Sequence, residues 1–436
     1  MRLFDNYLNE LDGVLSKKTK VSSSGLIEQR YFDQNITKAF NSASINEINR
    51  SSVPSIIEGP KVMLKYDKSA LIKYFGVNSH EFDNITIGPH PDFSDLDTLS
   101  YLNHHCVSVF VDIKGSTRLI EKYSLLEVRF IKDSLLTLAI KVANQFGGHV
   151  HRLQGDGIFL QFVRRGLSKN DAIINALNAT SILTHFVLTD LATIMNNYQI
   201  RPLKIRVGVD FGDDNQVLWS HYGIPGCGEL TTTSLHTDMA AKLQAKAYDN
   251  SILIGDNIKK TLDLKSDFYS IFENETNKEK VFYISHQFTY PFFVFNWQEY
   301  LLSLPFFSKA SNGTNLEIRE KPFSIECYIS DQDGSNMERY FPNSKSIPKL
   351  KKIDYFLKHG NLPYNKTSSE KIEWKAYNSG EQAKKANDLI HDFAKLNHDK
   401  NFCIAHAGYL GHHFVECKII REREDNVRIT FPIFVQ

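Results

Sequence analysis

Residues 106–113, with the sequence CVSVFVDI, alternate between branched apolar side chains and a second, more varied set of positions. This period of two predicts a buried strand. Asp112 lies near the end of the strand, although a carboxylate is rare in strands and costly to bury without a partner. Residues 114–117, KGST, follow as a turn into a helix, whose free backbone N–H groups favour phosphate. An acidic group beside a phosphate cradle needs a divalent cation between them, whereas an ordinary capped turn needs none.

A second carboxylate is placed at a tight turn within residues 148–163. Two strand-like runs there flank the sequence QGDG at 154–157, which is typical of a hairpin. Asp112 and Asp156 are joined by one amphipathic helix, predicted to run from Thr117 to Gln145, so the two strand ends can meet on neighbouring strands. Paired carboxylates of this kind hold metal ions for phosphoryl or nucleotidyl transfer, although single Asp-Gly turns are also common without one.

The remaining periodicity continues this alternation of strands and helices. Further elements are predicted as a helix at 168–197, a strand at 204–211, a turn at 213–215, a returning strand at 216–219, a helix at 235–246 and a strand at 252–254. The order is β-α-β-β-α-β with additional pieces. It predicts an α+β fold with a ferredoxin-like core, an antiparallel sheet covered by helices on one face.

Composition narrows the function classes only slightly. The 436 residues are enough for two or three domains, and the net charge of +1 gives no indication of a nucleic-acid partner. The five cysteines form no CxxC pair, which favours free thiols in a reducing compartment over disulfides or a zinc site. The first residues do not resemble a signal peptide, and no apolar run reaches the roughly 18 residues that a membrane span needs. We therefore expect a cytoplasmic protein without a membrane partner.

Four segments together resemble the class III nucleotidyl cyclases. They are VFVDIKGST at 109–117, RLQGDGIF at 152–159, IRVGVDFG at 205–212 and TDMAAKL at 237–243. The first two match the metal-binding segments of that family, and the last stands where the family has V-N-x-A-[SA]-R-[ML]. The segments occur in the family's order over about residues 100–287, which the resemblance identifies as a cyclase domain with the class III ferredoxin-like core.

The resemblance implies attack of a ribose 3′-hydroxyl on the α-phosphate of a nucleoside triphosphate, with release of pyrophosphate. Asp112 and Asp156 match the family's metal carboxylates, and the carbonyl of Ile113 matches its backbone ligand. Two divalent ions per site, Mg²⁺ or Mn²⁺, are expected. Arg206 matches an arginine that contacts the triphosphate, and Lys278 aligns with a late lysine that meets the phosphates. The expected cradle for the β- and γ-phosphates consists of the amides of Lys114, Gly115, Ser116 and Thr117.

Two catalytic positions depart from the family pattern. Asp238 replaces the asparagine that orients the ribose, and Lys242 replaces the arginine that stabilises the transition state. Lysine keeps the positive charge without the two-pronged geometry of arginine, while aspartate lacks the donor of an amide. An i,i+4 ion pair between the two is the alternative interpretation. In this family the site lies between two chains, so the resemblance also implies a homodimer with two equivalent sites.

The base-reading positions match neither purine pattern. Arg152 stands where adenine-specific members carry lysine, and Thr231 where they carry aspartate. This departure, with DIKGST and TTTSLHT, resembles the bacterial pyrimidine cyclases of Pycsar anti-phage defence. The resemblance implies that the chain makes cyclic CMP from CTP, or cyclic UMP from UTP, as a second messenger for a separate effector. We favour CTP because Arg152 offers two donors to the adjacent acceptors of cytosine; a purine cyclase with an altered code and an inactive nucleotide-binding module remain alternatives.

The chain is expected to consist of four parts. They are a mostly helical segment at 1–99, the cyclase domain at 100–287, a connecting helix and linker at 288–322, and a small α+β domain at 323–436. In the last part, IEWKAYNSGEQA and HAGYLGHHFVECKII resemble the sensor domain found behind bacterial cyclases. A helix is predicted there at 380–396. We expect this part to regulate the enzyme, because it contains no catalytic constellation.

Overall fold

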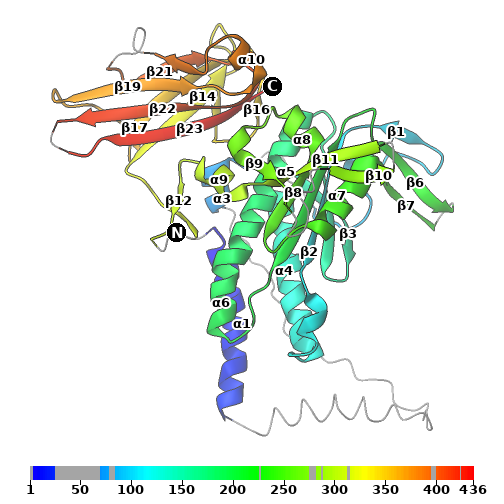
Figure 1. The fold of residues 1–436 in the computed structure, drawn as a ribbon. Coiled ribbons are helices and arrows are strands. Elements are labelled where there is room, and N and C mark those ends of the chain that lie inside the picture. Colours follow the sequence, from blue (N-terminus) through cyan, green and yellow to red (C-terminus); the bar gives the residue numbers. More distant parts are fainter. Residues whose placement is uncertain are drawn as a thin grey trace, which may run out of the picture.

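The computed structural model describes residues 3–24, 69–77, 84–224, 227–273, 281–285, 288–311, 315–393, 399–422 and 424–436. They form a central sheet with helices on both faces, an N-terminal helical part and a C-terminal pair of sheets (Figure 1). The α+β class predicted from the sequence is confirmed. Most of the predicted N-terminal helical segment and Lys278 lie outside the described residues.

The central sheet has the strand order β10-β11-β8-β5-β2-β4-β3, and β9 pairs with β11. Its strands are β2 (Cys106–Ile113), β3 (Gly148–Gln154), β4 (Gly157–Phe162), β5 (Ile205–Gly212), β8 (Ser251–Gly255), β9 (Tyr269–Ile271), β10 (Val281–Ser285) and β11 (Phe288–Phe295). The predicted hairpin and the predicted strand at 106–113 are both confirmed. Neighbouring strands run antiparallel except β5 and β8, which run parallel because a helix connects them.

The two helices of the predicted β-α-β-β-α-β core lie on one face of this sheet, and a further helix lies on the other face. Helices α4 (Leu125–Gln145) and α5 (Lys169–Phe186) pack on one face, where they share a core with the valines of β2 and β5. Helix α7 (Leu235–Lys246) covers the other face. The reason is Gly208 of β5, since a Cβ there would lie 2.1 Å from the carbonyl oxygen of Ala240 on α7. The missing side chain lets α7 lie directly on the strand.

The helix predicted from Thr117 begins later in the structure. A short 3-10 turn, η2 (Ser116–Leu119), comes first, and α4 starts only at Leu125. Ser124 caps α4, because its hydroxyl accepts from the backbone of Glu127 while the Glu127 side chain accepts from the Ser124 backbone. This reciprocal capping box fixes the start of the helix.

Helix α5 is the central helix of the core. It continues through the π-turn η3 (Val187–Leu191) into α6 (Ala192–Asn197), which confirms the predicted end near residue 197. By length and composition alone, residues 169–197 could cross a membrane, but 89% of their most apolar window is buried inside the structure. The N-terminal helix α1 (Asp5–Ser24) packs beside α5 and α6, and the hydroxyl of Tyr7 donates to the carbonyl of Ser134 at 3.0 Å (Figure 1). Helix α3 (Ser69–Phe75) adds Leu71 and Phe75 to the same core.

His185 near the end of α5 gives the fold a predictable pH dependence. Burial against Phe307 lowers the pKa of His185 from 6.5 to about 4. The unfolded chain therefore holds more protons between these two values, and stability falls as the pH is lowered through that window. Between pH 7 and pH 5, the free energy of unfolding of the parent should fall by about 2 kcal/mol more than that of His185→Phe, which keeps an aromatic ring but does not titrate. Urea unfolding at the two pH values measures this difference, and equal losses in both proteins would contradict it.

The C-terminal part consists of two five-stranded sheets that enclose a second core. One sheet contains β14 (Phe323–Ser330), β15 (Glu338–Tyr340), β17 (Lys352–His359), β18 (Leu362–Pro363) and β21 (Phe402–His406). The other contains β16 (Ser346–Ile347), β19 (Glu370–Tyr377), β20 (Ile390–Asp392), β22 (Gly411–Arg421) and β23 (Val427–Val435). The helix predicted for 380–396 is wrong in length, because α10 (Gly380–Lys385) ends before Asn387, whose φ of 53° closes a left-handed cap.

The two cores are connected through α5. Asp171 accepts two hydrogen bonds of 2.6 Å from the backbone and the hydroxyl of Ser346. The side chain of Asn178, fully buried, donates to the carbonyl of Asn343 at 2.9 Å. Phe434 of β23 belongs to the core of the central sheet rather than to the C-terminal one. Helix α9 (Trp297–Leu302), which confirms the predicted connecting helix, and the β12–β13 pair (Phe307–Lys309 and Leu316–Ile318) add their buried side chains to the core of the central sheet.

A small third sheet extends from the central one. It has the order β1-β6-β7, with β1 at Tyr101–Asn103, β6 at Leu218–Ile224 and β7 at Cys227–Thr233. The returning strand predicted at 216–219 therefore exists, but it pairs with β1 and β7 rather than with the central sheet. In Figure 1 this hairpin projects away from the C-terminal part.

Candidate active site

Asp112 and Asp156 meet at one end of the central sheet. Asp112 is the last residue but one of β2, which pairs with β4. Asp156 lies in the turn between β3 and β4, where Gly155 adopts a φ of 64° that favours glycine. The two carboxylates lie close enough for the charge of Asp156 to act on Asp112. Burial raises the pKa of Asp112, Arg206 opposes that rise, and the charge of Asp156 adds to it. The sequence prediction that these two side chains meet agrees with this geometry.

Cationic and amide side chains surround the carboxylate pair. Arg206 on β5 donates from Nη2 to Asp112 Oδ2 at 2.5 Å and from Nη1 to the carbonyl of Ala245 at 3.1 Å. Gln244 on α7 donates to the same Asp112 oxygen at 3.3 Å, and Lys132 on α4 lies 3.4 Å from Asp156 Oδ1. These partners come from elements on both faces of the sheet, so the pair sits where the sheet and its helices converge.

The pair has the electrostatic character of a cation site. Asp156 Oδ2 is buried and has no hydrogen-bond partner among the described residues. Two adjacent carboxylates with one buried oxygen unsatisfied repel each other unless a positive charge lies between them. Oxygen ligands of this kind are those that Mg²⁺ and Mn²⁺ prefer. The residues present therefore fit the divalent ions that the sequence predicts.

The loop after β2 provides part of the predicted phosphate cradle. Gly115 has a φ of 69° and precedes the η2 turn. The backbone N–H of Lys114 donates to the carbonyl of Lys204 at 2.8 Å, and its side chain pairs with Asp249 at 2.7 Å. Because the Lys114 amide is already occupied, we restrict the proposed cradle to the amides of residues 115–117.

The predicted base-reading residue Arg152 lies in a separate polar cluster. A β-bulge between Val150 and Arg152 shifts the β3–β4 register. Arg152 Nε donates to Glu229 Oε1 on β7 at 3.1 Å, and a second, closer contact joins the same two side chains. His151 lies 3.3 Å from the same carboxylate, and burial lowers the pKa of His151 to about 4. Thr231 follows Glu229 by two positions on β7 and so faces the same side of the strand.

The remaining predicted site residues are not brought to the carboxylate pair within one chain. Asp238 and Lys242 lie on the exposed side of α7, and no ion pair joins them in the part of the chain that the structure describes. Arg152 and Thr231 also contact neither aspartate among the described residues. These four residues therefore lie away from the carboxylate pair within one chain.

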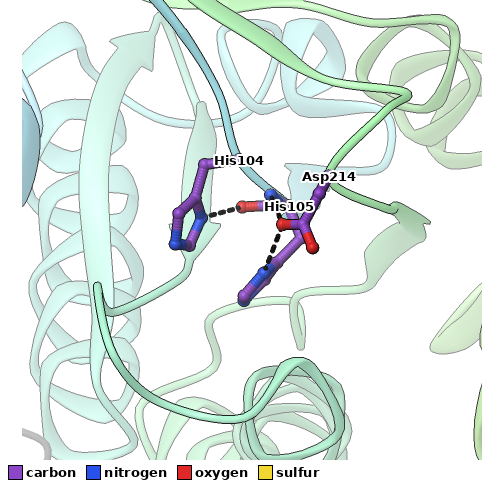
Figure 2. A group of neighbouring side chains, drawn as sticks. All are labelled: His104, His105 and Asp214. Carbon is purple, nitrogen blue, oxygen red and sulfur yellow. Dashed lines mark hydrogen bonds and ion pairs between the residues drawn. The ribbon is translucent and has the colours of Figure 1, made fainter.

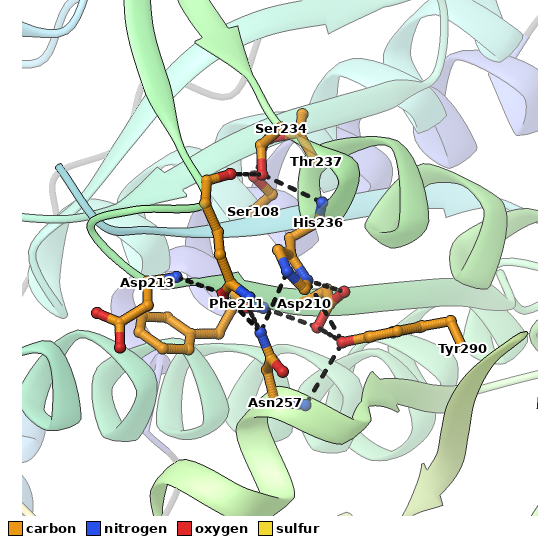
Figure 3. Close-up of polar contacts among 10 residues, drawn as sticks. Ser108, Asp210, Phe211, Asp213, Ser234, His236, Thr237, Asn257 and Tyr290 are labelled. Atoms are coloured by element: carbon orange, nitrogen blue, oxygen red, sulfur yellow. Dashed lines mark hydrogen bonds and ion pairs between the residues drawn. The ribbon is translucent and has the colours of Figure 1, made fainter. Parts of the chain in front are cut away.

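A buried polar network fixes α7 on the sheet (Figure 3). Asp210 of β5 accepts from His236 of α7 at 3.0 Å and from the hydroxyl of Tyr290 of β11 at 2.8 Å. Asn257, in α8 (Asp256–Thr261), lies 3.1 Å from His236 Nε2 and donates to the carbonyl of Phe211 at 2.9 Å. Asp210 is fully buried, and burial raises its pKa. The network sets the position of Asp238 and Lys242 relative to the strand that carries Arg206.

Three contact residues had no signal in the sequence. The carboxylate pair is contacted by Lys132 from α4 and by Gln244 from α7. The Glu229 carboxylate is contacted by His151 from the β-bulge. None belongs to a recognisable motif, because each contact depends on how separate elements pack.

Comparison with known proteins gives the family. The chain is 36% identical over 392 residues to a curated protein named cytidylate cyclase from Staphylococcus aureus. The aligned region covers 88% of this chain and 90% of that protein. The chain belongs to the cytidylate cyclase family. A second cytidylate cyclase, from Escherichia coli, is 28% identical over 404 residues, or 87% of this chain and 85% of that protein. The resemblance to nucleotidyl cyclases read from four short segments is thereby confirmed.

The C-terminal part of this cytidylate cyclase family member has a match of its own. Residues 296–435 match the Adenylyl/Guanylyl and SMODS C-terminal sensor domain, which begins inside the segment expected to be a linker. Among solved structures, the adenylyl cyclase CyaB from P. aeruginosa has a TM-score of 0.38 and 15% identity, covering 45% of this chain and 96% of that chain. The guanylyl cyclase Cya2 has a TM-score of 0.36 and 14% identity, covering 45% and 91%. The family assignment rests on the sequence relatives.

Proposed function

We propose that the chain converts CTP into 3′,5′-cyclic CMP and pyrophosphate. The observation that carries this proposal is the 36% identity, over 88% of the chain, to a relative named for that activity. The paired carboxylates at the end of β2 supply the chemistry that such a relative needs. The test is incubation of the purified chain with each of the four nucleoside triphosphates and Mn²⁺, with products identified by mass.

Asp112, Asp156 and the carbonyl of Ile113 would hold the metal ions, two per site. When bound, divalent ions lower the pKa of the ribose 3′-hydroxyl and balance the charge of the triphosphate. The amides at 115–117 would donate to the β- and γ-phosphates. Arg206, now paired with Asp112, is the cation nearest to the site and is the residue that contacts the triphosphate once Asp112 has another positive partner.

The proposed site is completed by a second copy of the chain. Asp238 and Lys242 are exposed on α7, so they can serve the site of a partner subunit, where Lys242 brings charge to the α-phosphate. Large apolar side chains on or beside the β1-β6-β7 sheet are exposed to an unusual degree, namely Leu99 (91%), Tyr101 (70%), Ile224 (68%) and Tyr222 (52%). This is the same sheet that carries Glu229 and Thr231. Exposed apolar sets of this kind mark protein interfaces and support the homodimer proposed from the family.

The Arg152–Glu229 cluster has the polarity that cytosine needs. The guanidinium offers adjacent donors to cytosine O2 and N3, and the Glu229 carboxylate can accept from the amino group at C4. Uracil presents a donor at N3 and an acceptor at O4, so it opposes this pattern at two positions. Thr231 can donate or accept and opposes neither base. This complementarity supports CTP over UTP.

We expect the parent to turn over CTP faster than UTP, and Glu229→Gln to lower that preference by about tenfold or more. The amide of glutamine can donate to uracil O4, whereas the carboxylate cannot. The ratio of initial rates with the two nucleotides measures the effect. Thr231→Ser, which keeps the hydroxyl, is the matched control and should leave the ratio near that of the parent. A parent that prefers UTP would reverse the choice of base, and one that prefers ATP would remove the pyrimidine proposal.

We further propose that the cyclic nucleotide serves as a second messenger in anti-phage defence, acting on a separate effector. This rests on the resemblance of residues 112–117 and 231–237 to the Pycsar cyclases. The match to a sensor domain at 296–435 is consistent with regulated rather than constant synthesis. The experiment is to infect cells that express the parent or an inactive variant and to compare cyclic CMP levels and phage yield.

A further inference from the structure

Two imidazoles and a carboxylate converge at the end of the central strands opposite the carboxylate pair (Figure 2). His104 and His105 immediately precede β2, and Asp214 lies in the turn that follows β5. One ligand atom from each side chain lies within 4.8 Å of the others, the only such group of three that the described residues contain. Asp112 is seven residues further along β2, roughly 23 Å away at about 3.3 Å per residue. The cluster is therefore separate from the candidate active site.

The hydrogen bond of His104 prepares its ring for a ligand. His104 Nδ1 lies 3.1 Å from the backbone carbonyl oxygen of His105. A carbonyl oxygen can only accept, so Nδ1 carries the proton and Nε2 keeps a free lone pair. Metal-binding histidines commonly donate their second ring N–H to a carbonyl in this way, which fixes the tautomer and the ring orientation.

The other two side chains are held in place by each other. The backbone N–H of His105 donates to Asp214 Oδ1 at 2.9 Å, and His105 Nδ1 lies 3.1 Å from the same oxygen. Asp214 Oδ2 has no hydrogen-bond partner within the described ranges, and 62% of the side chain is exposed. His105 is only 6% exposed, and its Nε2 lacks a partner among the described residues. If His105 Nδ1 binds a metal, its ring proton moves to Nε2, and its hydrogen bond to Asp214 is replaced by metal–ligand bonds.

We propose that the imidazoles of His104 and His105 and the Asp214 carboxylate bind a divalent transition metal, with zinc as the favoured ion. Two imidazole nitrogens and one carboxylate suit Zn²⁺ or Co²⁺, whereas Mg²⁺ and Ca²⁺ prefer oxygen ligands alone. Water completes a tetrahedral set. The Asp112–Asp156 pair, which offers only oxygen, selects the opposite class of ion, so the chain holds two kinds of metal site.

The cluster lies where the start of β2 meets the turn after β5, close to Gln436 of the C-terminal part, and this position indicates a structural role. The metal would clamp the start of β2 to the turn after β5. Asp213, next to Asp214, pairs with Lys169 at the start of α5 at 2.7 Å. His105 and Asp214 also border an open depression of about 530 Å³ whose lining includes Ser168, Lys169 and Gln436. This depression gives an ion a path of entry from solvent, next to residues of the C-terminal part.

The experiment is titration of the metal-free full chain with Zn²⁺ in excess Mg²⁺, which saturates the all-oxygen site. We expect one Zn²⁺ per chain, and we expect His104→Ala and Asp214→Asn each to weaken binding by about a hundredfold or more. His391→Ala is the matched control, because His391 also pairs with an aspartate, Asp388 at 3.3 Å, but has no second imidazole beside it. Unchanged Zn²⁺ affinity in both cluster variants would overturn the proposal.

A second measurement does not depend on any variant folding. Co²⁺ added to the parent in excess Mg²⁺ should give the visible absorption bands of a four-coordinate site with imidazole ligands, and Zn²⁺ should displace them stoichiometrically. Absence of these bands, or of stoichiometric Zn²⁺ uptake, contradicts the site directly. Because neither readout is cyclase activity, failure here leaves the proposed function untouched.

Discussion

Asparagine in place of Asp112 is expected to remove cyclase turnover while the chain stays folded. The substitution keeps the size of the side chain and deletes the charge that would bind the metal ions. Loss of that clamp forfeits several kcal/mol of transition-state stabilisation, or about a thousandfold or more in rate. Asp156→Asn should have the same effect, because both carboxylates are proposed to hold the ions. Rates with CTP and Mn²⁺ measure the loss.

The matched control for this prediction is Asp249→Asn. Asp249 is also an aspartate near the site and pairs with Lys114 and Lys204, but it does not touch the carboxylate pair. Its replacement should reduce the rate far less than either of the other two substitutions. Circular dichroism and thermal unfolding confirm that each variant is folded. Full turnover by folded Asp112→Asn would remove the metal assignment.

Mixing two inactive variants, Asp112→Asn and Lys242→Ala, is expected to restore activity. The proposed site takes its metal-binding carboxylates from one chain and Lys242 from the other. In a dimer formed from one chain of each kind, one site then carries both substitutions and the other carries neither. Random exchange makes half of all dimers mixed, so about a quarter of the parent activity should return.

The control for this experiment is a mixture of Asp112→Asn with Asp156→Asn. Both substitutions affect the same chain's contribution to a site, so no exchange can produce an intact one. Subunit exchange is verified independently with differently tagged chains. If exchange occurs and the first mixture stays inactive, the proposed site lies within one chain, and the exposed position of Lys242 has another cause.

The elements that place the carboxylate pair could be predicted from sequence because they are local. Alternation in residues 106–113 and the QGDG turn at 154–157 determine β2, β3 and β4 almost to the residue. Asp112 and Asp156 then meet because strands joined by a helix and a hairpin become neighbours. Such contacts follow from pattern and topology, before any knowledge of side-chain packing.

What the sequence did not predict depends on packing between distant elements. The placement of α7 on the second face follows from the absence of a side chain at Gly208, which has no periodicity to reveal it. The His151 contact arises from a bulge, which inserts one residue without changing the alternating pattern around it. The short α10 ends at a left-handed Asn387, although the apolar spacing beyond it continues as in a helix.

The enclosure of α5 has a consequence for the newly made protein. Its apolar surface is covered on one side by the central sheet and on the other by residues near 343–346 and by Phe434. A ribosome releases α5 long before it releases β23, so the part of the helix that contacts residues near 343–346 and Phe434 stays exposed until translation has passed residue 434. A prematurely terminated chain is therefore expected to display this surface of the helix to chaperones and proteases. The contacts of α5 with Ser346 and Phe434 thus tie the core of the central sheet to the part of the chain that is made last.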